Sequence, residues 1–270
     1  MERSAAGKGV VRFEKRGSRT VATETYSRSP LKFLSPGNAG HSAWVYSSNF
    51  GGGFIGGDAI DVDVEVMPES FGVLLTQAST KVYGSTEECK QTLHARVKKN
   101  AVFCSLPDPV VCFARSKFRQ HQRIDLEEGS SLILVDALHC GREHSGERWA
   151  FDSYVNEIHL YREGKRTLLE SQFIHPLMGE VSKRNFRFNA MAFIVLSGPH
   201  FEKNAEEIGD LIQSRPINAG EPFICSVSRF RDGILVRTAA VEMESLAEAT
   251  RELLYFLPEA LGDDPWARKW

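Results

Sequence analysis

The chain has 270 residues, of which 42% are hydrophobic and 25% charged, and its formal net charge is −2 at pH 7. These values are typical of a soluble globular protein and leave no overall charge that would attract nucleic acid or an anionic membrane. No apolar run reaches the roughly 18 residues of a membrane span and the N-terminus lacks a secretory signal, so we expect a cytoplasmic protein. Five scattered cysteines without a CxxC pair indicate neither a disulfide framework nor a structural zinc site.

Alternation with a period of two dominates the sequence. Residues 60–66 alternate Ile or Val with Asp or Glu, which is the pattern of a half-buried strand. The same reasoning, with turn residues between the segments, predicts strands at 20–26, 60–66, 72–78, 92–97, 101–105, 109–114, 131–137, 156–161, 166–174, 190–197, 222–228 and 234–241.

A faint internal repeat links two of these regions. Residues 64–75 and 124–135 resemble each other at an offset of 60 residues, and each contains a strand, an acidic turn and a second strand. A fixed offset is typical of stacked β coils, although two β-turn-β units can also resemble each other by chance.

Two later segments have a helical period instead. Residues 200–214 place their apolar side chains on one stripe. Residues 245–257 open with Ser245 and Glu248, which have the spacing of a capping box, and Pro258 is expected to end this helix. The sequence therefore predicts a mainly β protein, a layered or solenoid-like β-sheet scaffold with two α-helices in the C-terminal third, in a single domain of residues 1–270.

The most unusual segment is Gly51-Gly52-Gly53-Phe54-Ile55-Gly56-Gly57-Asp58, which satisfies the pattern GxGxxG. In a dinucleotide-binding protein this pattern opens a helix whose N-terminus binds the pyrophosphate, whereas here an alternating strand follows. Glycines supply positive φ angles and allow close approach of another segment. The segment is therefore either a tight β corner or a loop that docks a partner.

A second unusual segment, Thr76-Gln77-Ala78-Ser79-Thr80-Lys81-Val82-Tyr83, is dense in polar residues. Gln77 and Lys81 are costly to bury without hydrogen-bond partners. The segment is therefore either a solvated strand end or the wall of a polar site that includes Asp58.

Together, these two segments closely resemble the signature pair of the UreD (UreH) family of urease accessory proteins, in residues and in spacing. Weaker similarities follow at residues 29–31, 106–109, 141–147 and 261–270, so the resemblance covers nearly the whole chain. The chain departs from many bacterial members in having Asn49-Phe50 before the glycines where they have Pro-Pro. Residues 108–122 are more similar to the plant and fungal branch of the family.

The resemblance implies a mainly β fold with two helices and a role without catalysis. Family members bind apo-urease, recruit a UreF partner and, through the complex, the nickel-carrying GTPase UreG, and the metal is thought to pass through a channel in the UreD-type subunit. We therefore expect Ni²⁺ in transit, weakly bound, and no tightly bound cofactor. The C-terminal segment Leu246–Trp270 is expected to face a UreF-like partner. The expected docking or conduit residues are Gly56, Gly57, Asp58, Gln77, Thr80, Lys81 and Tyr83.

A third segment, residues 139–144, gathers imidazole, thiol and carboxylate groups of types that suit nickel. If the preceding strand reaches residue 140, His139 and Cys140 point to opposite faces, and both could bind one ion only at a bend. A conduit should bind its ion weakly because a tightly held ion does not leave. Asp58 and Glu143 are therefore candidate transit ligands alongside His139 and Cys140.

Two other classes of function have weaker support. Cys140 with His139, or Ser47 or Ser48 near His41, could be a nucleophile and base of a hydrolase, but no GxSxG or papain-like cysteine segment is present. Residues 115–123 interleave basic residues with one aromatic residue, as in some nucleic-acid-binding proteins. As a strand, however, they place alternate residues on one face that is solvated or meets an acidic partner. A non-catalytic interaction module of another function is the remaining alternative.

Overall fold

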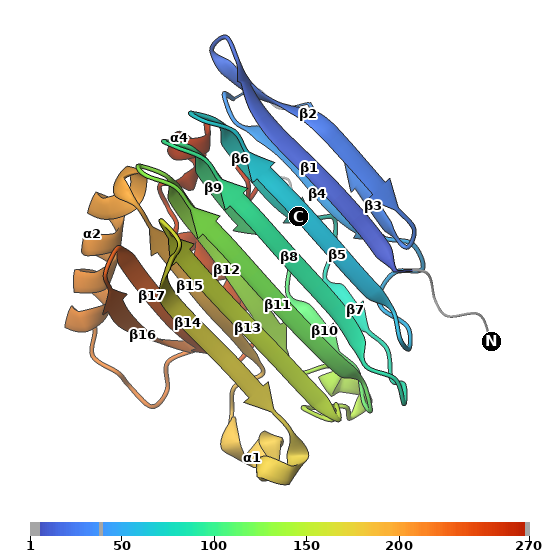
Figure 1. Ribbon diagram of the computed structural model, residues 1–270. Helices are drawn as coiled ribbons and strands as arrows, with labels where there is room; N and C mark the ends of the chain where they lie inside the picture. The colour runs from blue at the N-terminus through green and yellow to red at the C-terminus, as the bar shows by residue number, and fades with distance from the viewer. Residues whose placement is uncertain (1–5, 38–39, 268–270) are drawn as a thin grey trace.

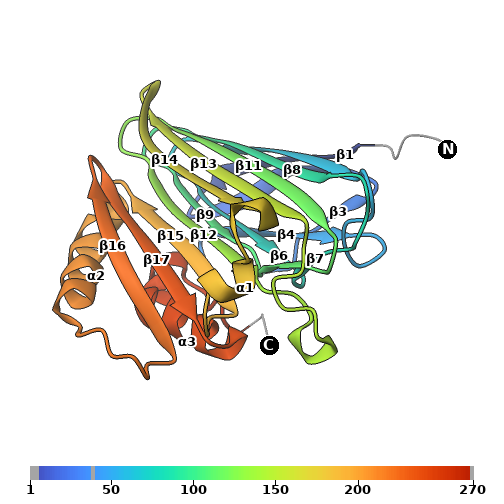
Figure 2. The ribbon, with the colours of Figure 1, turned by 90° about the horizontal axis from the view of Figure 1, so that it is seen from below.

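The computed structural model describes residues 6–37 and 40–267, and its strands form two large sheets that lie face to face (Figures 1 and 2). Strands account for 50% and helices for 16% of the residues, so the predicted mainly β class is confirmed. The seven-stranded sheet has the order β14 (Lys165–Ile174), β13 (Ser153–Arg162), β11 (Lys117–Leu126), β8 (Cys89–Val97), β5 (Ala59–Val66), β1 (Gly7–Arg16) and β2 (Arg19–Arg28).

The ten-stranded sheet faces it and is also mixed. Its order is β16 (Phe223–Phe230), β17 (Gly233–Ala240), β15 (Ala190–Ser197), β12 (Ser131–His139), β9 (Val102–Leu106), β6 (Phe71–Thr76), β4 (Ala43–Asn49) and β3 (Leu31–Leu34). Two short strands, β10 (Val110–Cys112) and β7 (Thr80–Val82), extend it beside β12.

The centre of the molecule is a two-sided solenoid. From β4 to β13 the long strands alternate between the sheets, so that β4, β6, β9 and β12 lie in one sheet and β5, β8, β11 and β13 in the other. Neighbouring strands of this series are parallel in both sheets. Strand β1 continues the parallel series beside β5, and antiparallel strands close the two ends, with β2 and β3 at one end and β14 to β17 at the other. The predicted solenoid-like scaffold is thus confirmed.

The internal repeat corresponds to two turns of this solenoid. Val66 pairs with Val97, and Val97 with Leu126, so the sequence offset of 60 residues spans two coils. The coil between them turns through Asn100, which has a left-handed backbone (φ 55°), as do Glu69 (φ 57°) and Gly129 (φ 67°) at the equivalent turns. The internal repeat in the sequence did not include the middle coil, because its turn, Lys98-Lys99-Asn100, is basic where the other two turns are acidic.

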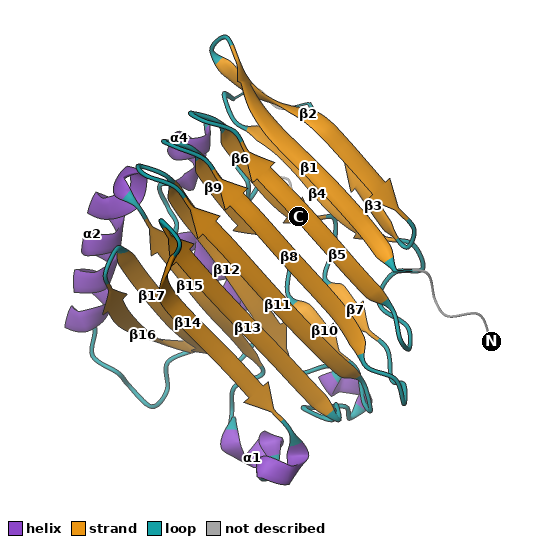
Figure 3. Ribbon diagram, in the orientation of Figure 1, coloured by secondary structure: helices purple, strands orange, loops and turns teal. Residues whose placement is uncertain are grey.

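Apolar side chains form two layers. The alternating strand β5 directs Ile60, Val62, Val64 and Val66 between the sheets, where they join the inter-sheet core. The second layer lies between the outer side of the ten-stranded sheet and the C-terminal helices (Figure 3). These are α2 (Glu202–Ser214), α3 (Met243–Leu253) and α4 (Leu257–Leu261), and α1 (Val181–Arg184) lies apart from them, below the end of β14.

Several element boundaries differ from the sequence predictions. Strands β1, β3, β4, β7 and β11 were not among the predicted strands, although β11 coincides with the segment considered for nucleic-acid binding. The predicted capping box is wrong: α3 starts at Met243 after Glu242, so Ser245 lies inside the helix. Pro258 does not end this helix, which stops at Leu253, but lies in the first turn of α4, where a missing N–H costs nothing. In the described part of the chain, no helix is long and apolar enough to cross a membrane.

Candidate functional site

The unusual segments meet at one end of the solenoid. Four connections run from the ten-stranded sheet back to the seven-stranded sheet, at residues 50–58, 77–88, 107–116 and 140–152. Because the strands that they join are parallel, all four lie at the same end of the coils. Short bridges link them side by side: Phe54 pairs with Val82, β7 with β10, and β10 with β12.

The glycine segment is a corner that lies directly against the next connection. The Phe54 N–H donates to the Lys81 carbonyl oxygen (2.8 Å), and the Tyr83 N–H donates to the Phe54 carbonyl oxygen (3.0 Å). At Gly53 a Cβ would collide with the carbonyl oxygen of Lys81, so a larger residue would separate the two segments. The glycines therefore allow two backbone segments to approach closely, as in the tight β corner that was one of the two interpretations of the sequence.

Asp58 closes the turn that ends the corner. Its Oδ2 atom accepts a hydrogen bond from the Ile55 N–H (2.9 Å), while its own N–H donates to the Ile55 carbonyl oxygen (3.0 Å). Gly56 lies against Ser85, and Gly57 has a left-handed backbone (φ 79°) beside Glu87. The predicted group of Gly56, Gly57 and Asp58 thus adjoins the second predicted segment.

The second segment, residues 76–83, bonds to neighbouring segments through its backbone and exposes several of its side chains. The Gln77 N–H donates to the Ser47 carbonyl oxygen (2.9 Å) and the Thr80 N–H to the Pro109 carbonyl oxygen (3.0 Å). Gln77 and Lys81 are exposed, and the Tyr83 ring meets that of Phe113 edge to face (5.2 Å between centroids). Gln77 and Lys81 are therefore on the surface, as the solvated reading of this segment expects.

A cavity opens beside these two segments and extends between the sheets. Its volume is about 120 Å³. Ser48, Asn49, Gly52, Ala78 and Ser79 line the outer part and are exposed or half-buried. The inner part is walled by both sheets and reaches buried side chains, among them Ser105, Gln120, Gln122 and Asp136.

A row of amide side chains crosses the seven-stranded sheet at the level of this cavity. Gln91 on β8 pairs in register with Gln120 on β11, Gln120 with Asn156 on β13, and Asn156 with Gln172 on β14. Since residues paired in register project from the same face, their amides stack along the solenoid axis. Nε2 of Gln120 donates to Oδ1 of Asn156 (3.4 Å), and Nδ2 of Asn156 donates to Oε1 of Gln172 (3.4 Å).

Asp136 of the opposite sheet meets this row. Its side chain is 3% exposed, and its Oδ2 atom accepts short hydrogen bonds from Nε2 of Gln120 and of Gln122. Burial raises the pKa of Asp136 to about 7, and the hydrogen bonds that it accepts, that from Gln122 foremost, act in the opposite direction. The carboxyl group can therefore gain or lose a proton near neutral pH. Beyond the amide row, Glu170 on β14 pairs with Arg237 on β17 (2.6 Å).

The third predicted segment follows β12. Sγ of Cys140 lies 3.8 Å from Oε2 of Glu143, which also accepts a hydrogen bond from Nδ2 of Asn189. Burial raises the pKa of the Cys140 thiol to about 12 and lowers the pKa of His139, so the thiol is protonated and the imidazole neutral at pH 7. Within residues 6–37 and 40–267, the four candidate ligands do not bring three ligand atoms within 4.8 Å of one another, and Asp58 lies on a different connection.

The groups considered for catalysis do not pair with each other. Oγ of Ser47 donates to the Leu75 carbonyl oxygen (3.2 Å), and the His41 ring packs against Phe71. Nδ1 of His139 accepts from the Gly141 N–H (3.4 Å). A protonated, buried thiol is also a poor nucleophile. This geometry gives no support to a hydrolase.

The basic segment forms the outer side of β11, as its strand interpretation predicted. Arg119 pairs with Glu88 (3.2 Å) and Arg123 with Asp125 (2.9 Å). These side chains are therefore neutralised by neighbouring carboxylates, which disfavours a phosphate-binding surface.

Sequence reasoning missed the polar interior. Gln120 and Gln122 stand between Phe118 and Ile124 at alternate positions, where an amphipathic strand places its buried side chains. Amides at such positions indicate a polar layer, and this signal was readable in the sequence. That Asp136 faces them from the other sheet was not readable, because it depends on the pairing of the coils.

The similarity to known proteins covers these two segments and nearly all of the rest of the chain. The family model described as "UreD urease accessory protein" matches residues 5–270. The chain is 41% identical over 266 residues to the urease accessory protein UreD of Sorangium cellulosum (strain So ce56), over 98% of this chain and 85% of that protein. It is 31% identical to urease accessory protein D of Oryza sativa subsp. indica, over 98% and 97% of the two chains, and 31% identical to that of Arabidopsis thaliana, over 97% and 100%.

Proposed function

The chain belongs to the UreD family of urease accessory proteins, and we propose that it is a non-catalytic scaffold that conducts Ni²⁺ to apo-urease. In this role it docks on apo-urease, binds a UreF-like partner and, through the complex, receives the ion from a UreG-like GTPase. A role in urease maturation follows from the family itself. The partners, the metal and the path are the proposal.

The observation that carries the conduit is the polar row inside an otherwise apolar sandwich. Gln91, Gln120 and Asn156 stack in register on one sheet, and Asp136 faces them from the other. Buried polar groups lower stability unless they are satisfied, so a continuous row of them calls for a functional reason. Amide and carboxylate oxygens at successive positions can contact a hydrated cation as it moves along the row.

Weak binding is consistent with this row. Amide oxygens are neutral ligands, and a single carboxyl group with a pKa of about 7 offers a negative charge that a proton can replace. An ion that enters is therefore attracted at Asp136 and released when the carboxyl group is protonated. The buried Cys140 thiol, in contrast, must first lose a tightly held proton.

The mouth and the two segments beside it form the proposed docking surface. Gly56, Gly57 and Asp58 shape the corner, and Gln77, Thr80, Lys81 and Tyr83 follow on the adjacent connection. The exposed Gln77 and Lys81 side chains are available to a partner across this surface. His139 ends β12, and Cys140 and Glu143 lie on the connection that follows it at the same end of the coils, where transient metal contact is proposed.

The second proposed surface is the C-terminal segment Leu246–Trp270. Its apolar residues, including Leu246 and Leu253, pack on the ten-stranded sheet, so a UreF-like partner would meet the polar side of α3 and the exposed Tyr255. Residues 268–270, with Trp270, lie outside the described residues.

The test is urease activity in nickel-supplied cells that express the cognate apo-urease and its other accessory proteins, with and without this chain. We expect activity and bound nickel in the purified urease only when the chain is present. Equal activity without it would contradict the proposal and leave a non-catalytic interaction module of another function. Pull-down of apo-urease by the chain in the same cells then separates docking from metal transfer.

A further inference from the structure

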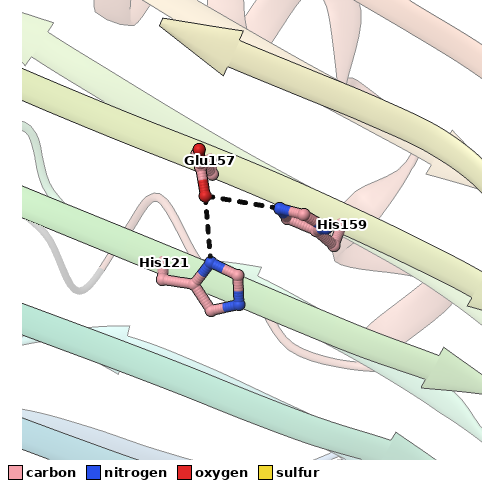
Figure 4. A group of neighbouring side chains, drawn as sticks. All are labelled: His121, Glu157 and His159. Atoms are coloured by element: carbon pink, nitrogen blue, oxygen red, sulfur yellow. Dashed lines mark ion pairs between the residues drawn. The ribbon is translucent and has the colours of Figure 1, made fainter. Parts of the chain in front are cut away.

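A cluster of two imidazoles and a carboxylate lies on the outer face of the seven-stranded sheet, away from the cavity. His121 on β11 pairs in register with Glu157 on the parallel strand β13, and His159 stands two residues farther along β13. Figure 4 shows the Glu157 carboxylate between the two imidazole rings. Gln120 and Gln122, on either side of His121 in the strand, point into the cavity, so His121 points away from it.

The spacing of the three groups fits one metal ion. Oε2 of Glu157 lies 3.4 Å from Nδ1 of His121 and 3.5 Å from Nε2 of His159. All three ligand atoms are within 4.8 Å of one another, and this is the only such group among the described residues. Ligands bound tetrahedrally at about 2.0–2.2 Å stand about 3.3–3.6 Å apart, so the two shorter distances already match a bound geometry.

The burial of His159 gives a second indication. Its Nε2 atom is shielded from solvent and makes no hydrogen bond to the residues that the structure describes, although Oε2 of Glu157 lies 3.5 Å away. A buried polar atom that makes no hydrogen bond costs free energy, and a metal ion held with Glu157 would satisfy this one. The His121 and His159 rings also lie close together, 4.7 Å between centroids, which is unfavourable when both imidazoles are protonated and favourable when both donate to one ion.

Neighbouring charges do not oppose a cation at this position. Arg119 and Arg123 flank His121 on the same face of β11, but each is paired with a carboxylate, Glu88 and Asp125 respectively. The guanidinium of Arg123 also stacks over the Tyr161 ring (4.3 Å). On the far side, β14 presents Ser171 and Leu169 opposite Glu157 and His159.

We propose that His121, Glu157 and His159 form a binding site for one divalent transition-metal ion of the type that prefers imidazole, such as Zn²⁺ or Ni²⁺. Two histidines and one carboxylate leave at least one position open to water or to a group from another molecule. This ligand set disfavours Mg²⁺ and Ca²⁺, which take oxygen ligands. The site is separate from the conduit, and its existence does not depend on the proposed role in urease maturation.

The test is isothermal titration of the purified full chain with Zn²⁺ and, separately, Ni²⁺, at pH 7.5. We expect His121→Gln and His159→Gln each to weaken the strongest site by about tenfold or more, because each removes one of three ligands. His94→Gln is the matched control: His94 lies on the same face, bonded to Asp125 (2.8 Å), and its loss should leave the affinity unchanged.

A spectroscopic measurement confirms which groups bind. With Co²⁺ as the probe, the parent chain should show visible absorption bands that shift or vanish in Glu157→Gln and persist in His94→Gln. Circular dichroism checks that each variant is folded. Equal affinity and equal spectra in the parent, His121→Gln and His159→Gln would overturn the site. Urease activation plays no part in this readout, so failure here leaves the conduit untouched.

Discussion

Asp136 is the residue whose ionisation is tied most closely to the fold. Its pKa is about 7 in the folded chain, where it is buried, against about 3.8 when it is solvated. The folded state therefore holds the proton more tightly than the unfolded state, and the free energy of unfolding falls as pH rises from about 4 to about 7. The full effect corresponds to about 4 kcal/mol at about 1.4 kcal/mol per pKa unit.

Replacing Asp136 by Asn tests this directly. The amide cannot ionise, so this contribution to the pH dependence should disappear, and Asp136→Asn should gain about 2.5 kcal/mol of stability relative to the parent as pH rises from 5 to 8. The measurement is urea denaturation of both chains at the two pH values. A constant difference between parent and variant at both would mean that Asp136 is ionised at low pH in the folded chain. In the urease assay the variant should activate poorly, because the amide row loses the carboxyl group that faces it.

At the scale of single residues, the sequence predicts functional residues whose local composition is unusual. It does not predict residues that become unusual only through their three-dimensional contacts. The glycine corner and Asp58 stand out because five glycines in eight residues are rare in a strand-rich chain. Gln120 and Asp136 are ordinary residues, 16 positions apart, and only the packing of the two sheets face to face brings β11 and β12 into contact at this point. Contacts across a sandwich depend on register, which local patterns do not determine.

At the scale of elements, the glycine corner depends on one close approach. Gly51 and Gly53 both have positive φ, but Gly51 has open space around it, whereas a Cβ at Gly53 would meet the Lys81 carbonyl oxygen. Gly51→Ala should therefore cost about 1–2 kcal/mol, from backbone conformation alone. Gly53→Ala should cost more and should also disturb β7. Denaturation of the two variants gives the comparison, and equal losses would show that the approach to Lys81 is relaxed easily.

The stacked turns of the solenoid allow a second test. Asn100 adopts the left-handed conformation at an exposed turn, between the turns at Glu69 and Gly129. Asn100→Ala should lower the free energy of unfolding by about 1 kcal/mol, while Asn100→Gly should change it by less than about 0.5 kcal/mol. Lys99→Ala, which removes only an exposed ion pair with Glu128, is the control and should be nearly neutral. If Ala and Gly at position 100 have the same stability, the backbone conformation of this turn is not the constraint.

Elements with a strict period were predicted well, and those without one were not. The alternating strand at 60–66 and the strand at 190–197 agree with β5 and β15 to within one residue. Strands β1 and β4 were missed because β1 carries charged residues on its outer side and β4 ends in three polar residues. The start of α3 was misplaced because a capping-box spacing within a helix cannot be told from one at its end without the backbone.

At the scale of the whole molecule, the solenoid explains how a chain can carry a polar path without losing its core. Each coil adds one strand to each sheet, so a polar residue at the same register in successive coils produces a continuous row. Toward the basic and acidic turns the inter-sheet layer is apolar, with Val66, Val97 and Leu126 in register. The path is therefore confined to one level of the sandwich, and the cohesion of the fold comes from the other levels.

Because the path is confined to one level, a single substitution can block the conduit without unfolding the chain. Gln91 lines the cavity between its mouth and the buried Asp136. Gln91→Leu replaces an amide by an apolar group of similar size, so the chain should fold and still bind apo-urease. A polar, hydrated ion should cross the apolar segment more slowly, because desolvation without replacement ligands is costly. We expect the urease purified with Gln91→Leu to contain less nickel and to be less active.

Thr92→Val is the matched control. Thr92 follows Gln91 on β8 but points to the outer face of the sheet, so this substitution removes a polar group from the same strand without touching the cavity. It should leave nickel content and activity unchanged. Both variants should be recovered with apo-urease in equal amounts, which separates docking from transfer. If Gln91→Leu activates urease as well as Thr92→Val does, the ion does not pass along the amide row, and the path would have to lie over the outer connections, past Cys140 and Glu143.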